Sequence, residues 1–208
     1  RQEPERIKSM IMQGRTRLLR NCNGLFSRWS NEVDIFCLHR VKEKLNKEDG
    51  EYCISSGYLE RLILMLGRMY NIRKLEDALE CQPERTEKRI ACITFDDCYK
   101  DWVETVLPIL EKYRVHATFF VSTGHLDSDI DQMAYIRRLG LTEKASDLLQ
   151  ESDIRLLNKS AYADIGCHTS QHERSTELSE LEFARDIRRS KKRLEEITQA
   201  EVTSFAYP

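Results

Sequence analysis

The chain has 208 residues, with 33 Lys or Arg against 35 Asp or Glu and a formal net charge of -2. That length is ample for one domain with its own hydrophobic core, and the near-neutral charge gives no reason to expect nucleic-acid binding. No apolar run approaches the length of a membrane span, and no charged start followed by an apolar stretch marks a signal peptide. We therefore expect one soluble domain.

The seven cysteines are an odd number, and no CxxC spacing occurs. This pattern predicts reduced thiols in a reducing, cytoplasmic compartment rather than disulfides or a four-cysteine zinc site. Cys37, Cys92 and Cys167 fall within expected strands, where we interpret them as core residues.

Residues 1–30 differ from the rest, because they contain seven Arg or Lys and only two Glu. Gly14 and the stretch 21–24 divide them into one or two helices, which predicts a basic N-terminal helical extension. Such a helix can lie on an anionic membrane surface, which would make the protein peripheral to the membrane. We favour a helix packed on the domain with solvated Arg side chains, because its apolar positions form no clean lipid-facing stripe.

Six short apolar runs have the length and composition of strands. In chain order they are Val33–Leu38, Ile72–Leu75, Ile90–Phe95, Ala117–Ser122, Tyr162–Cys167 and Val202–Ala206. The run Ile90–Phe95 is almost unbroken, as expected for a parallel strand that is covered on both faces.

Apolar residues at helical spacing lie between these runs. Ser56 is the expected N-cap of a first helix, and the charged residues 42–51 before it are interpreted as a loop. A second helix should kink, or start a new first turn, at Pro108. Ser179 and Glu182 form a capping box for a long third helix, whose run Arg185–Arg193 is interpreted as its solvated face.

Strands and helices alternate throughout, which predicts an α/β fold with parallel strands joined by right-handed crossovers. In such folds the carboxyl ends of the strands meet at one edge, where functional side chains gather. Polar residues directly after the predicted strands are therefore the candidate site residues.

Asp96 and Asp97 come directly after the run Ile90–Phe95. Two adjacent carboxylates at the end of a buried strand repel each other, so they are most easily kept where a metal or a proton takes up the charge. The alternative is a solvated turn in which Asp96 caps the following helix.

His168 and His172 follow the strand predicted at Tyr162–Cys167. Two imidazoles four residues apart can converge on one ion if the segment is helical or tightly turned. Thr169 stands where the helical HExxH signature has Glu, so that signature is absent. One Asp and two His would leave a coordination position open, as in a catalytic metal site.

Two further histidines lie near strand ends. His39 follows the strand at Val33–Leu38, and it suits a position lining the site as well as a hydrogen-bonded place in the core. His125 falls in the loop after Ala117–Ser122, where it could approach substrate, although a His in a loop is usually solvated.

Four stretches resemble, in order, the motifs of the polysaccharide deacetylases, which are metal-dependent carbohydrate esterases of the chitooligosaccharide-deacetylase type. They are Thr94–Cys98, Ala117–Phe120, His168–His172 and Phe205–Pro208. The resemblance implies a distorted, incomplete (β/α) barrel that is open or truncated at its C-terminal end, with residues 31–208 as the catalytic domain.

The resemblance also implies roles for the candidate site residues. Asp96 would be the general base, while Asp97, His168 and His172 would hold a divalent metal. That metal would be zinc, with cobalt or nickel as alternatives. The substrate would be an N-acetylated carbohydrate. The enzyme would hydrolyse the amide carbon–nitrogen bond that joins an acetyl group to the sugar.

The chain departs from the family pattern at three places. Cys98 stands where the family usually has Gly, so a turn with positive φ there would be strained. Ala206 stands where many members have an Arg that orients the base. The residues that supply the general-acid His and part of the oxyanion hole would follow Pro208.

Three other functions fit some of these residues. A phosphohydrolase could use the Asp pair, but it would need a Gly-rich loop or clustered Arg near the site, and neither is seen. Hydrolysis of an O-acetyl ester uses the same groups as hydrolysis of an amide. A protein that keeps the metal ligands without turnover would bind glycan instead, and Ala206 is compatible with that.

Overall fold

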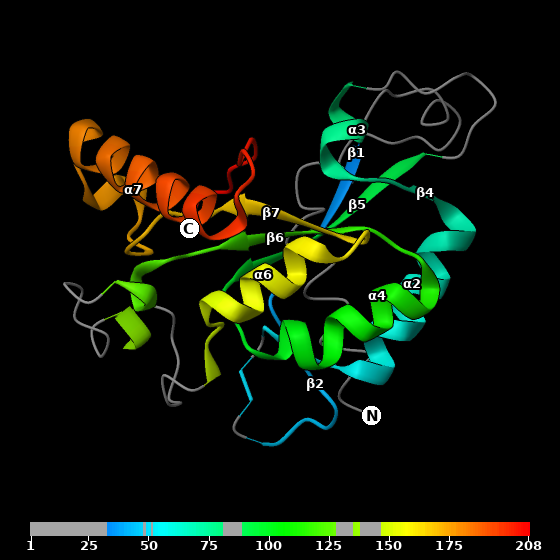
Figure 1. Cartoon of the computed structure of the whole chain (residues 1–208). Coiled ribbons are helices and arrows are strands. Elements are labelled where there is room, and N and C mark those ends of the chain that lie inside the picture. Colours follow the sequence, from blue (N-terminus) through cyan, green and yellow to red (C-terminus); the bar gives the residue numbers. More distant parts are fainter. Residues whose placement is uncertain (1–32, 48, 51, 81–88, 128–134, 138–146) are drawn as a thin grey trace.

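The computed structural model describes residues 33–208 except positions 48, 51, 81–88, 128–134 and 138–146 (Figure 1). The basic extension predicted at residues 1–30 lies outside the described residues. None of the described helices is both long enough and apolar enough to span a lipid bilayer.

Parallel strands form the central sheet, in the order β1-β5-β6-β7, with β4 beside β5. Their bounds are β1 (Val33–Leu38), β4 (Asn71–Ile72), β5 (Ile90–Asp97), β6 (Ala117–Val121) and β7 (Ala163–Cys167). β1 pairs with β5 from Ile90 to Phe95, and β6 pairs with the other edge of β5 from Thr94 to Asp97. β4 occupies the start of that second edge. The central position of β5 explains its unbroken apolar run, because both faces are covered.

Two strand predictions need correction, and one pair of strands was not predicted. β4 is only Asn71–Ile72, and Leu75 begins the helix α3 (Leu75–Glu80) instead of ending a strand. The segment Val202–Ala206 forms no strand, since its one ladder contact is a bridge between Phe205 and Cys167. A separate parallel pair, β2 (Arg40–Lys42) and β3 (Cys53–Ser55), was not predicted, because three residues are too few to show a period.

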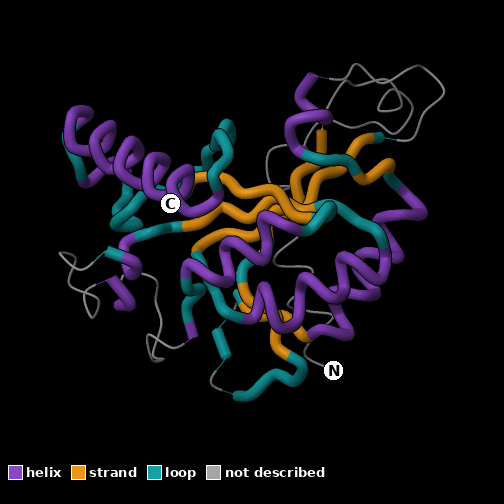
Figure 2. The backbone as a smooth tube through the Cα atoms, viewed as in Figure 1, coloured by secondary structure: helices purple, strands orange, loops and turns teal. Residues whose placement is uncertain are grey.

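The described helices surround the central sheet. Figure 1 shows α2, α4 and α6 along one side of it. Figure 2 shows the same arrangement by element type, with the strands gathered in the middle. The bounds are α2 (Ser56–Met69), the π-helix η2 (Trp102–Val106), α4 (Leu107–Tyr113), α6 (Glu151–Lys159) and α7 (Glu180–Thr198), with short 3-10 turns η3 (Gly124–Leu126) and η5 (Ser175–Glu177).

The helix starts follow side-chain capping. The N-cap of α2 is Ser55, whose hydroxyl accepts from the Tyr58 amide, so Ser56 is the first helical residue and the predicted cap was one residue late. The capping box of Ser179 and Glu182 at the start of α7 is confirmed.

Pro108 explains the change of helix type between η2 and α4. A proline inside an α-helix clashes with the carbonyl four residues earlier and cannot donate a hydrogen bond. Here the preceding turn is wider, because the Leu107 amide donates to the Trp102 carbonyl five residues back. Pro108 then lies in the first turn of α4, which confirms the predicted break.

The core beneath the site is aromatic. The rings of Phe95 and Phe119, on neighbouring strands, stack at 5.2 Å, and Trp102 packs against both. All three residues are fully buried. The Trp102 Nε1–H donates to the His39 carbonyl at 2.8 Å, which fixes the chain just after β1.

The α/β class with parallel strands is confirmed. Among the described residues the strand order runs from β1 to β7 without closing into a complete barrel. The carboxyl ends of β1, β5, β6 and β7 therefore lie along one edge, and that edge carries the candidate site residues.

Gly166 in β7 lets Phe120 pack against the strand that precedes His168. A Cβ at position 166 would overlap the Phe120 ring and lie 2.7 Å from the Ser204 hydroxyl. We expect Gly166→Ala to lower the free energy of unfolding by about 1–3 kcal/mol, as forced overpacking does. Urea denaturation measures this difference.

Gly67 provides the matched control. A Cβ there meets nothing within 4 Å, and Gly67 lies inside the helix α2. Gly67→Ala should raise the free energy of unfolding by roughly 0.5–1 kcal/mol, because alanine restricts the unfolded chain and favours the helix. If both substitutions have the same effect, close packing at Gly166 is not important for stability.

Candidate active site

Three side chains converge at the carboxyl edge of the sheet. Asp97 is the last residue of β5, and His168 and His172 follow β7. β6 lies between these two strands, and its end is bonded to both sides: the Ser122 amide donates to the Asp97 carbonyl, and the His168 amide donates to the Val121 carbonyl. The sheet register therefore sets the distance between the carboxylate and the histidines.

The distances in this cluster are short. His172 Nε2 lies 3.0 Å from Asp97 Oδ1, and His168 Nε2 lies 3.6 Å from the same oxygen. One ligand atom from each of the three residues lies within 4.8 Å of the other two. A carboxylate oxygen and two imidazole nitrogens at such spacing can hold a divalent metal.

The backbone at Asp97 takes up a left-handed conformation, with φ of 90°. Side chains of consecutive strand residues point to opposite faces, so Asp96 and Asp97 can serve one region only if the chain turns there. The turn lies at Asp97 and not at Cys98, where strain was expected. Because both Asp residues belong to β5, the interpretation of Asp96 as a helix cap is wrong.

The two histidines are brought together by a tight turn and not by a helix. Thr169 and His172 have φ of 64° and 53°, in the left-handed region that non-glycine residues rarely adopt. The Thr169 hydroxyl accepts a hydrogen bond from the His172 amide at 3.1 Å, which closes the turn. Thr169, which distinguishes the motif from the helical HExxH signature, thus shapes the turn.

Asp186 on α7 stabilises this turn through hydrogen bonds to its main chain. Its carboxylate accepts hydrogen bonds from the amides of Ser170 and Gln171, all at 3.2 Å. Asp186 is buried, so the interpretation of Arg185–Arg193 as a solvated face is wrong at this position. A sequence signal was present, because Asp186 and Ser190 share the helical spacing of the apolar residues Phe183, Leu194 and Ile197.

The ring of His168 is oriented by a backbone group. His168 Nδ1 lies 3.0 Å from the Ala206 carbonyl oxygen, so Nδ1 carries the proton and donates it to that oxygen. Nε2, which faces Asp97, is then the nitrogen that is free to accept a cation. Ala206 therefore contributes through its main chain, a role that no side-chain pattern could reveal.

Burial alone would raise the pKa of Asp97, but its contacts with His168 and His172 and the nearby His39 hold that pKa well below the ordinary range. The carboxylate is therefore ionised although Asp97 is only 5 % exposed. A buried anion facing two imidazoles is an environment that favours a bound cation.

Asp96 points toward β1. Its Oδ2 accepts a hydrogen bond from the Cys37 thiol at 3.0 Å, while its Oδ1 is buried and makes no hydrogen bond among the described residues. Although Cys37 is exposed as a residue, the protein atoms packed around its sulfur and the neighbouring Asp96 carboxylate raise the pKa of the thiol far above its usual range, which keeps it protonated as the donor. Cys92 and Cys167 are buried as predicted, but Cys37 is exposed and was wrongly interpreted as a core residue.

His39 belongs to this part of the site. One of its ring nitrogens lies within 4.8 Å of ligand atoms of Cys37 and Asp96. The sequence allowed His39 either to line the site or to lie hydrogen-bonded in the core. The structure favours the position that lines the site.

His125 is buried and not solvated, which corrects the sequence interpretation. Burial lowers its pKa to about 4, so the ring is neutral. His125 Nε2 lies 2.5 Å from the Leu149 carbonyl oxygen, and Nδ1 lies 3.7 Å from Cys98 Sγ. Cys98 also contacts the Tyr135 hydroxyl at 3.3 Å, so these three residues form a packed polar cluster behind the site.

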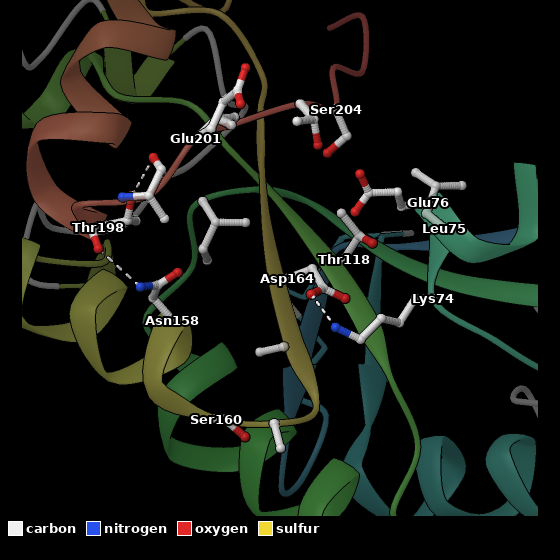
Figure 3. Close-up of a pocket in the computed structure, with 16 residues that line it drawn as sticks. Lys74, Leu75, Glu76, Thr118, Asn158, Ser160, Asp164, Thr198, Glu201 and Ser204 are labelled. Carbon is white, nitrogen blue, oxygen red and sulfur yellow. Dashed lines mark hydrogen bonds and ion pairs between the residues drawn. The ribbon is translucent and has the colours of Figure 1, made fainter. Parts of the chain in front are cut away.

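A cavity of about 320 Å³ lies at the opposite end of the strands (Figure 3). It is lined by residues at the starts of β6 and β7, including Thr118 and Asp164, and the Lys74–Asp164 ion pair of 3.0 Å crosses it. The strand ends that carry Asp97 and His168 do not contribute to it. The cavity is therefore separate from the candidate active site.

A family model described as polysaccharide deacetylase matches residues 83–208. A poly-beta-1,6-N-acetyl-D-glucosamine N-deacetylase of Staphylococcus aureus is 26% identical over 129 residues, which are 58% of this chain and 40% of that relative. The chain thus spans less than half the length of the curated relatives it matches.

Solved structures show the same fold. The deacetylase PplD of Streptococcus pyogenes, in complex with acetate, superposes with a TM-score of 0.66 at 19% identity, over 85% of this chain and 73% of that one. IcaB from Ammonifex degensii gives a TM-score of 0.67 at 21% identity, over 86% and 75% of the two chains. The chain belongs to the polysaccharide deacetylase family.

The contacts of Asp186 generate a prediction about the metal site. Asp186→Leu should weaken divalent-metal binding by about ten- to hundredfold, the usual cost of losing a group that positions ligands. Asp186→Asn keeps a carbonyl oxygen that accepts a hydrogen bond from one of the two amides, so this variant should retain most of the affinity for the metal. Calorimetric titration with Zn²⁺ measures both variants, and thermal unfolding without metal checks that each is folded.

Glu196→Leu is the matched control, because Glu196 lies on the same helix with its side chain 53% exposed. It should leave metal affinity unchanged. Equal affinity in Asp186→Leu and the unaltered protein would mean that the histidine turn keeps its shape without the carboxylate.

Proposed function

We propose that this protein is a metal-dependent deacetylase that hydrolyses N-acetyl groups on an amino-sugar glycan. The observation that carries the proposal is the convergence of Asp97, His168 and His172, together with the adjacent Asp96, whose buried Oδ1 makes no hydrogen bond within the described part of the chain. Membership of the polysaccharide deacetylase family supports it. The S. aureus relative suggests a β-1,6-linked N-acetylglucosamine polymer as the first substrate to test.

The donor set suits a zinc ion held by three protein ligands, with cobalt or nickel as alternatives. One carboxylate and two imidazoles leave a coordination position for water or substrate. The His172 side chain is 18% exposed and that of His168 is 2% exposed, so the open side of the cluster is the side of His172. The Ala206 carbonyl and Asp186 hold the two histidines in place.

A bound divalent metal would supply Lewis acidity, polarising the acetyl carbonyl and lowering the pKa of water in the site. Asp97, His168 and His172 would hold that metal and keep it on one side of the acetyl group. Asp96 would accept the proton of the attacking water, because its Oδ1 has no hydrogen-bond partner among the described residues. Cys37 holds the other carboxylate oxygen and so fixes the orientation of the base.

A protonated group must then deliver a proton to the departing amine. His39 is close enough to Asp97 to lower the pKa of that residue, but its ring lies beside Asp96, the proposed general base. By family resemblance the general acid would be a His that follows Pro208, so the rate of acetate release is to be measured in the full-length protein. The cytoplasmic location inferred from the thiols stays a prediction.

The two adjacent carboxylates should respond differently to substitution. Asp96→Asn should keep the metal and lower the rate of acetate release by roughly a hundredfold or more, as loss of a general base does. Asp97→Asn should lower metal occupancy, because a neutral amide replaces an anionic ligand. Elemental analysis gives the occupancy, and acetate release from an N-acetylated β-1,6-glucosamine oligomer gives the rate.

The opposite result, an emptied site in Asp96→Asn and a full one in Asp97→Asn, would reverse the two roles. Unchanged occupancy and rate in both variants would contradict the proposed function. An O-acetylated sugar assayed beside the N-acetylated one distinguishes the main alternative, since an esterase would release acetate from the ester alone.

A further inference from the structure

A second group of metal-ligand side chains lies beside the cluster of Asp97, His168 and His172. Its members are Cys37, His39 and Asp96, each of which offers one ligand atom within 4.8 Å of the other two. The parallel pairing of β1 with β5 brings them together, because Cys37 lies opposite Thr94 and the two strands end side by side. We refer to these three residues as the β1–β5 cluster.

Two buried polar atoms of the β1–β5 cluster have no partner. His39 Nδ1 and Asp96 Oδ1 make no hydrogen bond among the described residues. Leaving such an atom unsatisfied costs about 1–3 kcal/mol, so its retention calls for an explanation. The His39 carbonyl accepts a hydrogen bond from Trp102, and the His39 ring lies 4.9 Å from the Tyr52 ring, so these two contacts limit its movement.

The chemistry of the three side chains is that of a zinc site. Thiolate, imidazole and carboxylate are the usual zinc ligands, with Zn–S near 2.3 Å and Zn–O near 2.0–2.2 Å. At a tetrahedral angle these lengths place sulfur and oxygen roughly 3.5 Å apart. Cys37 Sγ and Asp96 Oδ2 are 3.0 Å apart, so a movement of about half an ångström would admit the ion. Cys37 is exposed, which gives an ion access from solvent.

We propose that Cys37, His39 and Asp96 form a second site for a thiophilic divalent cation such as Zn²⁺. The thiol proton would leave to solvent as the sulfur binds, as happens when a metal replaces the proton of a cysteine. The thiolate ligand makes the β1–β5 cluster selective for Zn²⁺, Co²⁺ or Cd²⁺ over Mg²⁺ and Ca²⁺. The cluster of Asp97, His168 and His172 contains no sulfur, so the two sites differ in chemistry.

This site has a consequence that rests on the proposed function. A cation bound at Asp96 Oδ2 would draw negative charge from the carboxylate and make Oδ1 a weaker acceptor for a proton from water. A cation in the β1–β5 cluster therefore inhibits turnover, so that the enzyme is active with one equivalent of zinc and inhibited by excess zinc.

Cobalt titration tests the site directly, because Co²⁺ bound to thiolate has an intense near-ultraviolet absorption that Co²⁺ bound to imidazole and carboxylate lacks. We expect two equivalents of Co²⁺ per chain in the metal-free protein, with the thiolate band accompanying one of them. Cys37→Ser should bind one equivalent and show no thiolate band. The same stoichiometry in both proteins, or a band that persists in Cys37→Ser, would overturn the proposal.

The control variant removes other thiols. Cys22 and Cys81 lie outside the described residues, while Cys53, Cys92, Cys98 and Cys167 are buried. The double substitution of Cys22 and Cys81 by Ser should keep both equivalents and the band. If the band disappears in that variant, the thiolate comes from elsewhere and the β1–β5 cluster is not the site.

Zinc inhibition provides the second measurement. Excess Zn²⁺ should lower turnover on the order of a hundredfold at saturation, the scale of losing a general base, and Cys37→Ser should largely relieve this inhibition. The ratio of rates with one equivalent and with excess Zn²⁺ is compared within each protein. Equal ratios in the two proteins count against the site.

The cobalt result separates this proposal from the proposed function. If the full-length protein shows the thiolate band but releases no acetate, the second site stands and the deacetylase assignment is lost. A protein that binds a single equivalent without the band and releases acetate keeps the assignment and loses the second site.

Discussion

The ionised carboxylate of Asp97, buried at the end of the central strand, is the constraint on which the site depends. An anion that is only 5 % exposed requires compensation, and His168 and His172 are placed to provide it. Its backbone is held at positive φ, so the fold also bears conformational strain at this residue. Strain and buried charge at one residue are what a preorganised cation site requires.

The surroundings of Asp97 are arranged to keep the histidines in place. The turn from Thr169 to His172 has two residues at positive φ, and its amides are satisfied by the Thr169 hydroxyl and by Asp186 on α7. The ring of His168 is fixed by the Ala206 carbonyl. A helix, a strand end and a segment near the end of the chain thus cooperate to orient two imidazoles, which is why substitutions outside the ligand set should matter.

Asp96 connects this cluster with the strand β1. Its carboxylate accepts a hydrogen bond from the Cys37 thiol and lies close to His39, so the proposed general base is a member of the β1–β5 cluster and the sequence neighbour of Asp97. The protein keeps a thiol and an imidazole next to a group that must accept protons. Proton transfer and cation binding would compete for the same carboxylate, and the balance would depend on the supply of thiophilic metal.

Local patterns in the sequence were enough to predict the parallel α/β fold, the strands from Val33, Ile90 and Ala117, and the set of Asp96, Asp97, His168 and His172 at one edge. Apolar periodicity and the carboxyl ends of parallel strands are local signals, so they can be read residue by residue. Three contacts could be seen only in the folded chain: Asp186 supports the histidine turn, the Ala206 carbonyl orients His168, and Cys37 contacts Asp96. These contacts join residues 15 to 59 positions apart, and crossover packing sets such distances, whereas a one-dimensional pattern records only which residues share a face.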